Sequence, residues 1–164
     1  MSIQVPLYAR DGTVRAWSIV DDEDAHLAAY RLCLHHAGYA KRQAPNGNGR
    51  KRTVLLHRAI LGLVHGDDWE ADHVDGDRLN NRRANLRAVT HAENSQNRAS
   101  QPGTSRYRGV SWSEWTHKWQ VQVAVNGRVF YLGRFLNEDE AGRVASECRL
   151  LLMPFTNEDR MVAA

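Results

Sequence analysis

The chain contains little cysteine: only Cys33 and Cys148 occur in its 164 residues, and they lie far apart in the sequence. Two isolated cysteines match neither the paired spacing of a zinc knuckle nor the framework of a disulfide-rich domain. We therefore expect no structural zinc. We also expect a reducing compartment, the cytoplasm, because disulfide bonds rarely persist there.

Long apolar runs are missing as well. No stretch approaches the roughly 18 consecutive apolar residues that a membrane-spanning helix needs. The first residues, MSIQVPLYARDG, lack the hydrophobic core that a secretory signal carries. The sequence therefore predicts a protein that is neither secreted nor bound to a membrane.

Acidic residues are absent from one long segment of the chain. Residues 25–66 contain seven Lys or Arg and no Asp or Glu, although the formal net charge of the whole chain is only +3. The sequence pI is about 9.1. This uneven distribution favours a polyanionic partner, and a solvated basic surface without a partner is the alternative. The length allows one compact domain or two small ones, and two fit the changes in composition better.

The first third of the chain predicts a hairpin and a helix. Strand-like residues at positions 3–7 and 14–20 flank Asp11 and Gly12, which are typical of a turn. Four consecutive acids then precede residues 26–34, where apolar side chains recur at helical spacing. Because acidic side chains stabilise a helix amino terminus, we expect a helix there.

A basic loop over residues 38–52 is rich in Pro, Gly and Asn and lies between two short strand candidates. We expect a hairpin whose tip contacts phosphate groups, because cations on a surface loop neutralise them. These cations are Lys41, Arg42, Arg50, Lys51 and Arg52. A helix is predicted over residues 54–64, and we interpret His57 within it as a packing residue or a neighbour of the site. Residues 1–69 are therefore expected to extend the domain that follows.

The segment EADHVDGDRLNNRRANLRAVTHAENSQN, residues 70–97, combines strand, turn and helix signals. Asp72 and His73 lie in a short alternating run typical of a strand. A glycine and an asparagine pair end this run with turn chemistry. Residues 86–89 are predicted to form a second short strand.

Thr90 and Glu93 form a capping box, which predicts a helix that starts at Thr90. On this helix Asn94, Asn97 and Arg98 lie at positions i, i+3 and i+4, so that they share one face. The succession of strand, loop, strand and helix is expected to bring Asp72, His73 and Asn94 together. Carboxylate and amide oxygens suit Mg²⁺ or Mn²⁺, and an imidazole can accept a proton near neutral pH.

The residues DHVDGDRLNNRRANLRAVTHAENSQN resemble the motif of HNH endonucleases, in the His-Asn-Asn form of phage and intron-associated homing enzymes. The resemblance implies a ββα-metal fold in which Asp72 and Asn94 bind one divalent ion. It implies that His73 activates water and that Asn85 braces the loop that orients His73. The cations and amides around the motif are expected to contact DNA: Arg82, Arg83, Asn97 and Arg98.

The last third of the chain has a cleaner pattern. Residues 107–113, 119–125 and 129–135 are strand candidates, and Asn126-Gly127 predicts a type I′ hairpin turn. Asn137 and Glu140 form a second capping box, and the helix after it has one apolar stripe. We expect three antiparallel strands packed on one helix.

The segments SRYRGVSW, HKWQVQV, FYLGRF and EDEAGRVA resemble the plant APETALA/ethylene-response-factor DNA-binding domain. The resemblance implies that the sheet enters the major groove. Strand parity predicts a DNA-facing set of Ser111, Ser113, Gln120, Gln122 and Tyr131. Phosphate or guanine contacts are expected from Arg106, Arg108, Lys118, Arg128 and Arg134. Trp119 is interpreted as a core residue, whereas Trp115 fits binding and packing equally well.

The predicted fold class is therefore α+β: a ββα-metal nuclease with an amino-terminal α+β extension, followed by a small three-stranded antiparallel sheet on one helix. The predicted parts are a nuclease domain at residues 1–99 (extension 1–69, ββα-metal motif 70–99), a linker at 100–105, a DNA-binding domain at 106–153 and a tail at 154–164.

The predicted function is a metal-dependent, site-preferring endonuclease of homing type that nicks double-stranded DNA. It is expected to act as a monomer in the cytoplasm of a bacterial or phage-infected cell. The cofactor is one Mg²⁺ or Mn²⁺ ion. The alternative is a non-cleaving, sequence-specific DNA-binding regulator built from the same parts.

Overall fold

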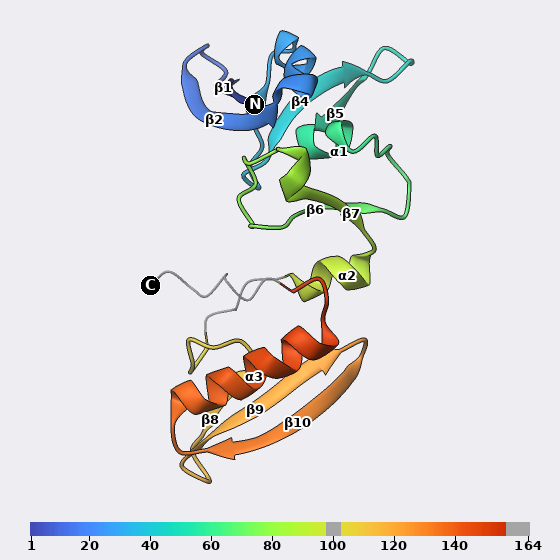
Figure 1. Ribbon diagram of the computed structural model, residues 1–164. Helices are drawn as coiled ribbons and strands as arrows, with labels where there is room; N and C mark the ends of the chain where they lie inside the picture. The colour runs from blue at the N-terminus through green and yellow to red at the C-terminus, as the bar shows by residue number, and fades with distance from the viewer. Residues whose placement is uncertain (98–102, 157–164) are drawn as a thin grey trace. The chain divides into compact units, whose positions relative to one another are not determined.

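The computed structural model describes residues 1–97 and 103–156 (Figure 1). The fold is mixed α+β with small antiparallel sheets. The chain divides into two compact units, residues 1–91 and the residues from Ala92 onward. The linker predicted at residues 100–105 lies partly outside the described residues, and the predicted domain boundaries stay a prediction. Within the described residues, no helix is long and apolar enough to cross a membrane.

The predicted amino-terminal hairpin is confirmed. Strands β1 (Ser2–Tyr8) and β2 (Val14–Asp21) pair in antiparallel fashion. Because side chains alternate along a strand, Val5, Leu7 and Val20 point into the core and are buried.

The helix predicted over residues 26–34 is wrong. Asp22–Ala29 form a 3-10 helix, η1, and Cys33–Leu34 form a short strand, β3. The Tyr8 amide donates a hydrogen bond of 2.8 Å to the carbonyl of Leu32, which is buried. These contacts with β1 outweigh the weak helical spacing, because tertiary packing overrides local propensity.

A second hairpin consists of β4 (Ala40–Pro45) and β5 (Lys51–Leu55), as predicted for the basic loop. The helix expected over residues 54–64 is shorter than predicted. Val54 and Leu55 are the last residues of β5 and pair with β4, so they are not available to the helix. Helix α1 covers only Leu56–Ile60, and the left-handed φ of 71° at Gly62 follows it.

The strand, strand and helix predicted for the central segment are confirmed as elements. They are β6 (Glu70–His73), β7 (Leu86–Val89) and α2 (His91–Gln96). A short 3-10 turn, η2 (Arg83–Asn85), leads into β7. Strands β6 and β7 pair in antiparallel fashion in the first unit, whereas α2 from Ala92 onward belongs to the second.

One hydrophobic core holds the first unit together and joins the amino-terminal strands to β7. Its buried residues are Val5, Leu7, Val20, Leu32, Ala40, Leu56, Ile60 and Leu86. The residues that precede the central segment therefore share its core.

The second unit contains a three-stranded antiparallel sheet with the order β10-β9-β8, in which β8 is Val110–Ser113, β9 is Lys118–Val125 and β10 is Arg128–Phe135. Helix α3 (Glu138–Leu152) packs on one face of this sheet (Figure 1). Asn137 caps α3, because its side-chain oxygen accepts the amide protons of Asp139 and Glu140.

The alternation of β9 decides which face α3 covers. Val121, Val123 and Val125 are buried in the core beneath α3, as predicted. Asn126 and Gly127 both have positive φ, 50° and 77°, as a type I′ turn requires. The first strand starts at position 110 and not at 107, because the preceding residues form a turn.

Candidate functional site

His73 ends β6 and is buried, with 4% of its surface exposed. Its ring stacks on Tyr39 at a centroid distance of 5.9 Å and meets the edge of the His57 ring at 5.0 Å. Burial lowers the pKa of His73 below the ordinary imidazole value, although the Asn81 hydrogen bond and nearby aspartates oppose this effect. The imidazole is therefore neutral at neutral pH, the form that accepts a proton.

A chain of three hydrogen bonds runs from His73 into β2. Nε2 of His73 lies 3.3 Å from Oδ1 of Asn81. Nδ2 of Asn81 donates to Oγ of Ser18 at 2.8 Å, and the Ser18 hydroxyl donates to the Leu79 carbonyl at 3.0 Å. Asn81 and Ser18 are both fully buried. The sequence-based prediction gave neither residue a role in the site, because an asparagine in a turn and a serine in a strand carry no local functional signal.

Asp72 precedes His73 on β6 and is also buried, with 7% exposed. It pairs across the sheet with Arg87 on β7. The guanidinium of Arg87 donates to Oδ2 of Asp72 from Nε at 2.9 Å and from a terminal nitrogen at 2.7 Å. Arg87 therefore holds the orientation of the Asp72 carboxylate, a contact that the sequence did not predict.

Asn85 closes the loop between β6 and β7. Its Nδ2 donates to Oδ1 of Asp75 and to the Asn80 carbonyl, both at 2.8 Å, and its Oδ1 accepts from the Asp75 amide at 3.0 Å. Burial alone would raise the pKa of Asp75, but hydrogen bonds from Asn80 and Asn85 outweigh it and lower that pKa. This geometry is consistent with the predicted bracing role of Asn85.

His57 lies on α1 between Tyr39 and His73, with ring centroids 4.8 and 5.0 Å away. Burial, followed by the charges of His73 and Arg58, lowers the pKa of His57 to about 3. Among the described residues, its buried Nδ1 has no hydrogen-bond partner. His57 therefore stays neutral and forms one wall of the site, in agreement with its interpretation as a packing residue.

Asn94 and Asn97 lie on or just after α2, in the second unit, whereas Asp72 and His73 lie in the first. The meeting of Asp72 with Asn94 therefore stays a prediction. Asn97 is buried, with 3% exposed, so the exposed position expected for a DNA contact is not observed. Arg98 lies outside the described residues.

The two arginines of the β6–β7 loop are paired with acids of the first unit. Arg83 binds the buried Asp24 through two hydrogen bonds of 2.8 Å. Arg82 lies 3.5 Å from an oxygen of Asp21. The acids around η1, expected only to start a helix, thus hold this loop. Arg83, which was predicted to contact DNA, binds a buried acid of its own unit.

The donor types of Asp72 and Asn94 fit a hard divalent ion, because Mg²⁺ and Mn²⁺ prefer carboxylate and amide oxygens and keep several waters. Among residues 1–97 and 103–156, no three His, Cys, Asp or Glu side chains group as a metal site.

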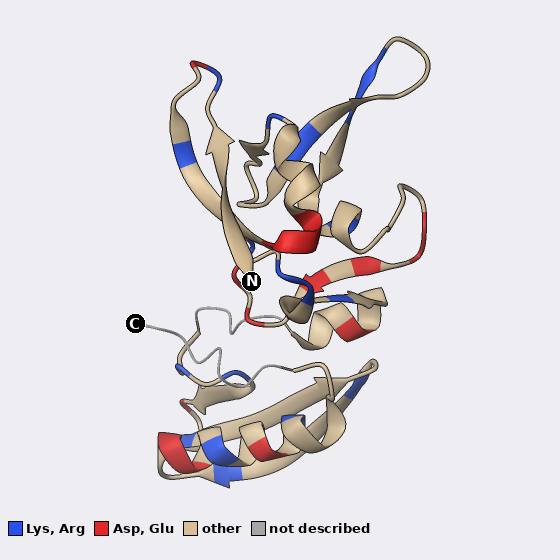
Figure 2. Ribbon diagram, turned by 45° about the horizontal axis from the view of Figure 1, so that its top comes forward, with Lys and Arg blue, Asp and Glu red and all other residues tan. Residues whose placement is uncertain are grey.

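The β4–β5 hairpin carries the predicted basic loop and shows its cations along both strands (Figure 2). Lys41 and Arg42 lie on β4, Lys51 and Arg52 on β5, and Arg50 at the tip. The Arg42 guanidinium lies over the Tyr30 ring, 4.1 Å from its centroid, in a cation–π contact.

A shallow pocket of about 680 Å³ lies beside this hairpin, between the β1–β2 turn and β3. Arg10, Arg15, Arg31 and Lys41 line it, and its lining within the described residues includes no carboxylate. Arg31 is anchored by a hydrogen bond of 2.8 Å to the Ala9 carbonyl. Three of these cations were missed because they are scattered in sequence, and only the fold collects them.

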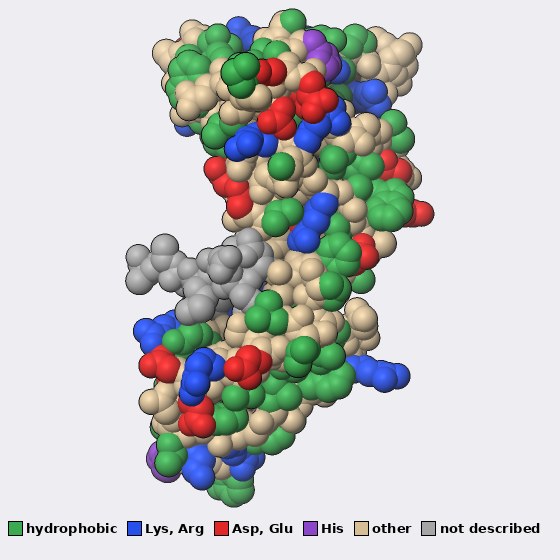
Figure 3. Space-filling view, viewed as in Figure 1, with side chains coloured by type: hydrophobic (Ala, Val, Ile, Leu, Met, Phe, Trp, Pro, Cys, Tyr) green, Lys and Arg blue, Asp and Glu red, His purple; other side chains and the backbone are tan. Residues whose placement is uncertain are grey.

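In the second unit, the strand register gathers the predicted reading residues on one face. Ser111 and Arg134 both pair with Gln120, Tyr131 pairs with Gln122, and Ser113 pairs with Lys118. Paired residues point to the same face, which here is opposite the face that packs on α3. Side chains of both charge signs lie along the exposed side of α3 (Figure 3), which makes that side a poorer match for a polyanion.

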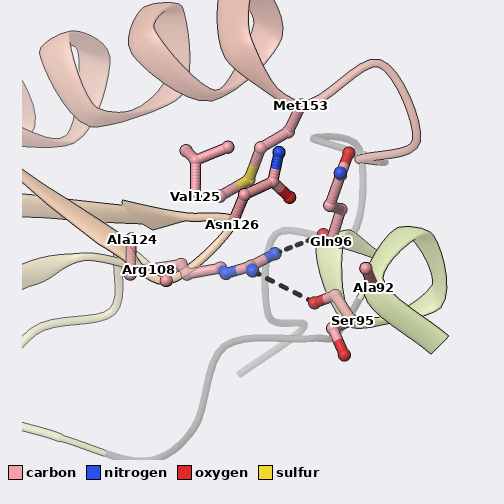
Figure 4. Close-up of a pocket in the computed structure, with 9 residues that line it drawn as sticks. Ala92, Ser95, Gln96, Arg108, Ala124, Val125, Asn126 and Met153 are labelled. Atoms are coloured by element: carbon pink, nitrogen blue, oxygen red, sulfur yellow. Dashed lines mark hydrogen bonds between the residues drawn. The ribbon is translucent and has the colours of Figure 1, made fainter.

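The remaining predicted contacts lie elsewhere. Arg108 donates to the carbonyls of Gln96 at 2.6 Å and Ser95 at 3.4 Å, at the carboxyl end of α2 (Figure 4). It lines a pocket of about 360 Å³ within the second unit. Arg106 forms an ion pair with Asp139. Arg128 is the strand partner of Val125, so it lies on the side of the sheet that α3 covers. Trp115, with 87% exposed, is not a core residue.

Comparison with known proteins identifies the central segment. Residues 54–96 match the HNH endonuclease family. Protein 3.8 of Escherichia phage T7 is 38% identical over 79 residues, which cover 48% of this chain and 64% of the phage protein. The chain thus spans less than two thirds of the length of this relative. No solved structure matches the chain.

The matched segment runs from the end of β5 to the end of α2 and includes Asp72, His73, Asn85 and Asn94. The chain therefore carries an HNH endonuclease domain, a phosphodiesterase domain that acts on DNA. The predicted enzyme class is confirmed for this domain.

Proposed function

We propose that this chain is a metal-dependent endonuclease of homing type that hydrolyses phosphodiester bonds in double-stranded DNA by cutting one strand at a time. The observation that carries the proposal is the buried, neutral His73 beside Asp72 at the end of β6, inside the segment that matches HNH endonucleases. An oriented neutral imidazole is suited to take a proton from water, and a neighbouring carboxylate is suited to a divalent ion.

Each residue has a separate task in this proposal. His73 accepts the proton of the attacking water, and Asn85 keeps the β6–β7 loop closed so that the imidazole does not swing away. Asp72 and Asn94 would hold one Mg²⁺ or Mn²⁺ ion, which would supply a Lewis acid for the charge that develops on the phosphate. Arg87 holds the Asp72 carboxylate in place through two hydrogen bonds.

We propose that the second unit, residues 106–153, reads DNA with the sheet face opposite α3, as its resemblance to the APETALA/ethylene-response-factor domain implies. Support comes from the register, which collects hydroxyl, amide and cationic side chains on that face. These are Ser111, Ser113, Lys118, Gln120, Gln122, Tyr131 and Arg134. Amides and arginines suit base edges in the major groove, and lysine suits phosphate.

We also propose that the cationic pocket of the first unit and the β4–β5 hairpin contact DNA phosphates. The pocket brings together four cations without a carboxylate among its described lining residues. A phosphate backbone offers the charge that such a cluster needs, and contacts of this kind position DNA without reading its sequence.

The test is incubation of closed circular plasmid with the purified full chain and Mg²⁺ or Mn²⁺. We expect nicked circles to form first, because one site cuts one strand and the protein is proposed to act as a monomer. The His73→Ala variant should lose about 100-fold or more of the cleavage rate and keep its DNA affinity, and His26→Ala, at an exposed position, is the matched control.

Two outcomes would contradict the proposal. DNA binding without cleavage by the wild-type chain would favour the alternative, a non-cleaving DNA-binding regulator. Linear DNA that appears without a preceding nicked species, at a rate second order in protein, would show that two chains act together.

A further inference from the structure

We propose that Ser18 and Asn81 are positioning residues that hold His73 in the Nε2–H tautomer and so present Nδ1 as the proton acceptor. This inference rests on the proposed role of His73 and adds the amino-terminal hairpin to the site. We call the hydrogen-bonded series Ser18–Asn81–His73 the relay. It starts on β2, and its Ser18–Asn81 hydrogen bond joins residues 63 positions apart. Ser18 also lies outside the segment that matches HNH endonucleases.

The donor and the acceptor of each hydrogen bond in the relay can be assigned from the groups that can only accept. The Leu79 carbonyl can only accept, so the Ser18 hydroxyl, 3.0 Å away, donates its proton there. The oxygen of Ser18 is then left as an acceptor. The Asn81 atom that faces it at 2.8 Å must be the amide nitrogen, Nδ2.

The same logic fixes the next step. With Nδ2 directed at Ser18, the atom of Asn81 that faces His73 is Oδ1, at 3.3 Å from Nε2. An amide oxygen has no proton to donate, so Nε2 of the neutral ring must carry the hydrogen. The other tautomer would set two lone pairs against each other in a buried place, where an unmade hydrogen bond is costly.

Backbone hydrogen bonds keep the relay in register. The Ile19 amide donates to the Leu79 carbonyl, and the Asn81 amide donates to the Ile19 carbonyl, both at 2.8 Å. Strand β2 is thereby fastened to the loop that carries Asn81. Because both relay side chains are fully buried, water cannot easily replace either partner.

The test is nitrogen NMR of the full-length chain with ¹⁵N-labelled histidine, at neutral pH and without metal or DNA. The chain has eight histidines, so the His73 signals are assigned by their loss in a His73→Gln variant. We expect the wild-type ring to show a protonated Nε2 and an unprotonated Nδ1. A dominant Nδ1–H tautomer in the wild type would overturn the proposal without any variant.

Two variants separate positioning from mere support of the fold. Asn81→Asp keeps an acceptor opposite Nε2 and should keep Nε2 protonated, while its carboxylate raises the pKa of His73. Asn81→Ala removes the acceptor and should give a mixture of tautomers, with a fall of roughly 10- to 100-fold in kcat and little change in KM. Unchanged tautomer and kcat in folded Asn81→Ala would overturn the relay.

The Ser18→Ala variant provides a second, independent test of the relay. Without the hydroxyl, the Asn81 amide can rotate and offer its NH₂ group to Nε2, which should favour the Nδ1–H tautomer. Glu147→Ala, at an exposed position of α3 outside the proposed DNA-contacting surfaces, is the control and should leave both tautomer and kcat unchanged. A wild-type chain with the expected tautomer and no cleavage would overturn the proposed nuclease function and leave the relay standing.

Discussion

His57 and His73 lie in one buried aromatic cluster, yet the structure gives them different surroundings. His73 has a polar partner in Asn81, whereas among the described residues the buried Nδ1 of His57 has none. A protonated His57 would therefore place an uncompensated charge in the cluster. Burial, followed by the charges of His73 and Arg58, lowers the pKa of His57 to about 3, so His57 suits a wall. The Asn81 hydrogen bond opposes the effect of burial at His73, which suits a base.

We predict that His57 makes stability depend on pH. Its pKa is about 3 in the folded chain, compared with 6.5 for an unperturbed imidazole. Between these values the unfolded state binds a proton that the folded state does not, so stability falls as pH falls, by about 1.4 kcal/mol per pH unit. Urea unfolding at pH 7 and pH 5 should show a smaller loss for His57→Phe than for the wild type.

The control for this measurement is His65→Gln, because His65 is exposed and should not alter the pH dependence. Equal pH dependence in the wild type and in His57→Phe would show that His57 is protonated in the folded chain.

At the scale of elements, an irregularity in β10 determines which side chains lie on the proposed DNA-reading face of the second unit. The register shifts between Tyr131 and Gly133, so Leu132 is an extra residue on this strand. Simple alternation would put Tyr131 and Arg134 on opposite faces. The shift puts both on the face away from α3, and the Arg134 guanidinium lies 6.0 Å from the centroid of the Tyr131 ring.

We predict that Gly142→Ala on α3 destabilises the chain, although the same change normally stabilises a helix by up to about 1 kcal/mol. A Cβ at Gly142 would lie 2.6 to 2.7 Å from atoms of the Tyr107 ring. Because an aromatic ring cannot bend away, the expected loss is about 1–3 kcal/mol. Urea unfolding followed by tryptophan fluorescence measures it.

The exposed Glu147→Ala on the same helix is the control and should change stability little. The penalty of Gly142→Ala should shrink in a Tyr107→Ala background, since the clashing ring is gone. A rise of the unfolding midpoint in the single Gly142→Ala variant would contradict the clash.

At the scale of the whole molecule, each unit has its own cationic surface. The first unit collects Arg10, Arg15 and Arg31 in its pocket, and the second presents Lys118 and Arg134 on the open sheet face. If both surfaces bind phosphates, each contributes separately to the salt dependence of DNA binding, because every neutralised phosphate releases counterions.

We predict that a variant with Arg10→Gln, Arg15→Gln and Arg31→Gln binds a DNA duplex with a weaker salt dependence. The slope of log affinity against log salt should fall by about 0.9 for each lost phosphate contact. Fluorescence anisotropy in a His73→Ala background measures binding without cleavage. Arg143→Gln, at an exposed position of α3, is the control, and an unchanged slope in the triple variant would place the DNA elsewhere.

Local patterns were enough to predict the elements whose signal lies within a few residues. The β1–β2 hairpin, the strands β6 and β7, and the sheet with α3 follow from alternation, turn residues and capping. The helix expected over residues 26–34 failed because Leu32 binds β1. The prediction of a DNA contact for Arg83 did not foresee the buried Asp24, which lies 59 residues away in the sequence.

The sequence by itself determined the chemical inventory of the site: Asp72, His73, Asn85 and Asn94 at the spacing of an HNH motif, and the period of the strands and helix around them. Only the tertiary structure decided how these groups are held. Ser18 and Asn81 orient His73, Arg87 holds Asp72, and cations distant in sequence share one pocket. The physical reason is that hydrogen-bond direction and burial depend on partners far along the chain, and no local pattern specifies them.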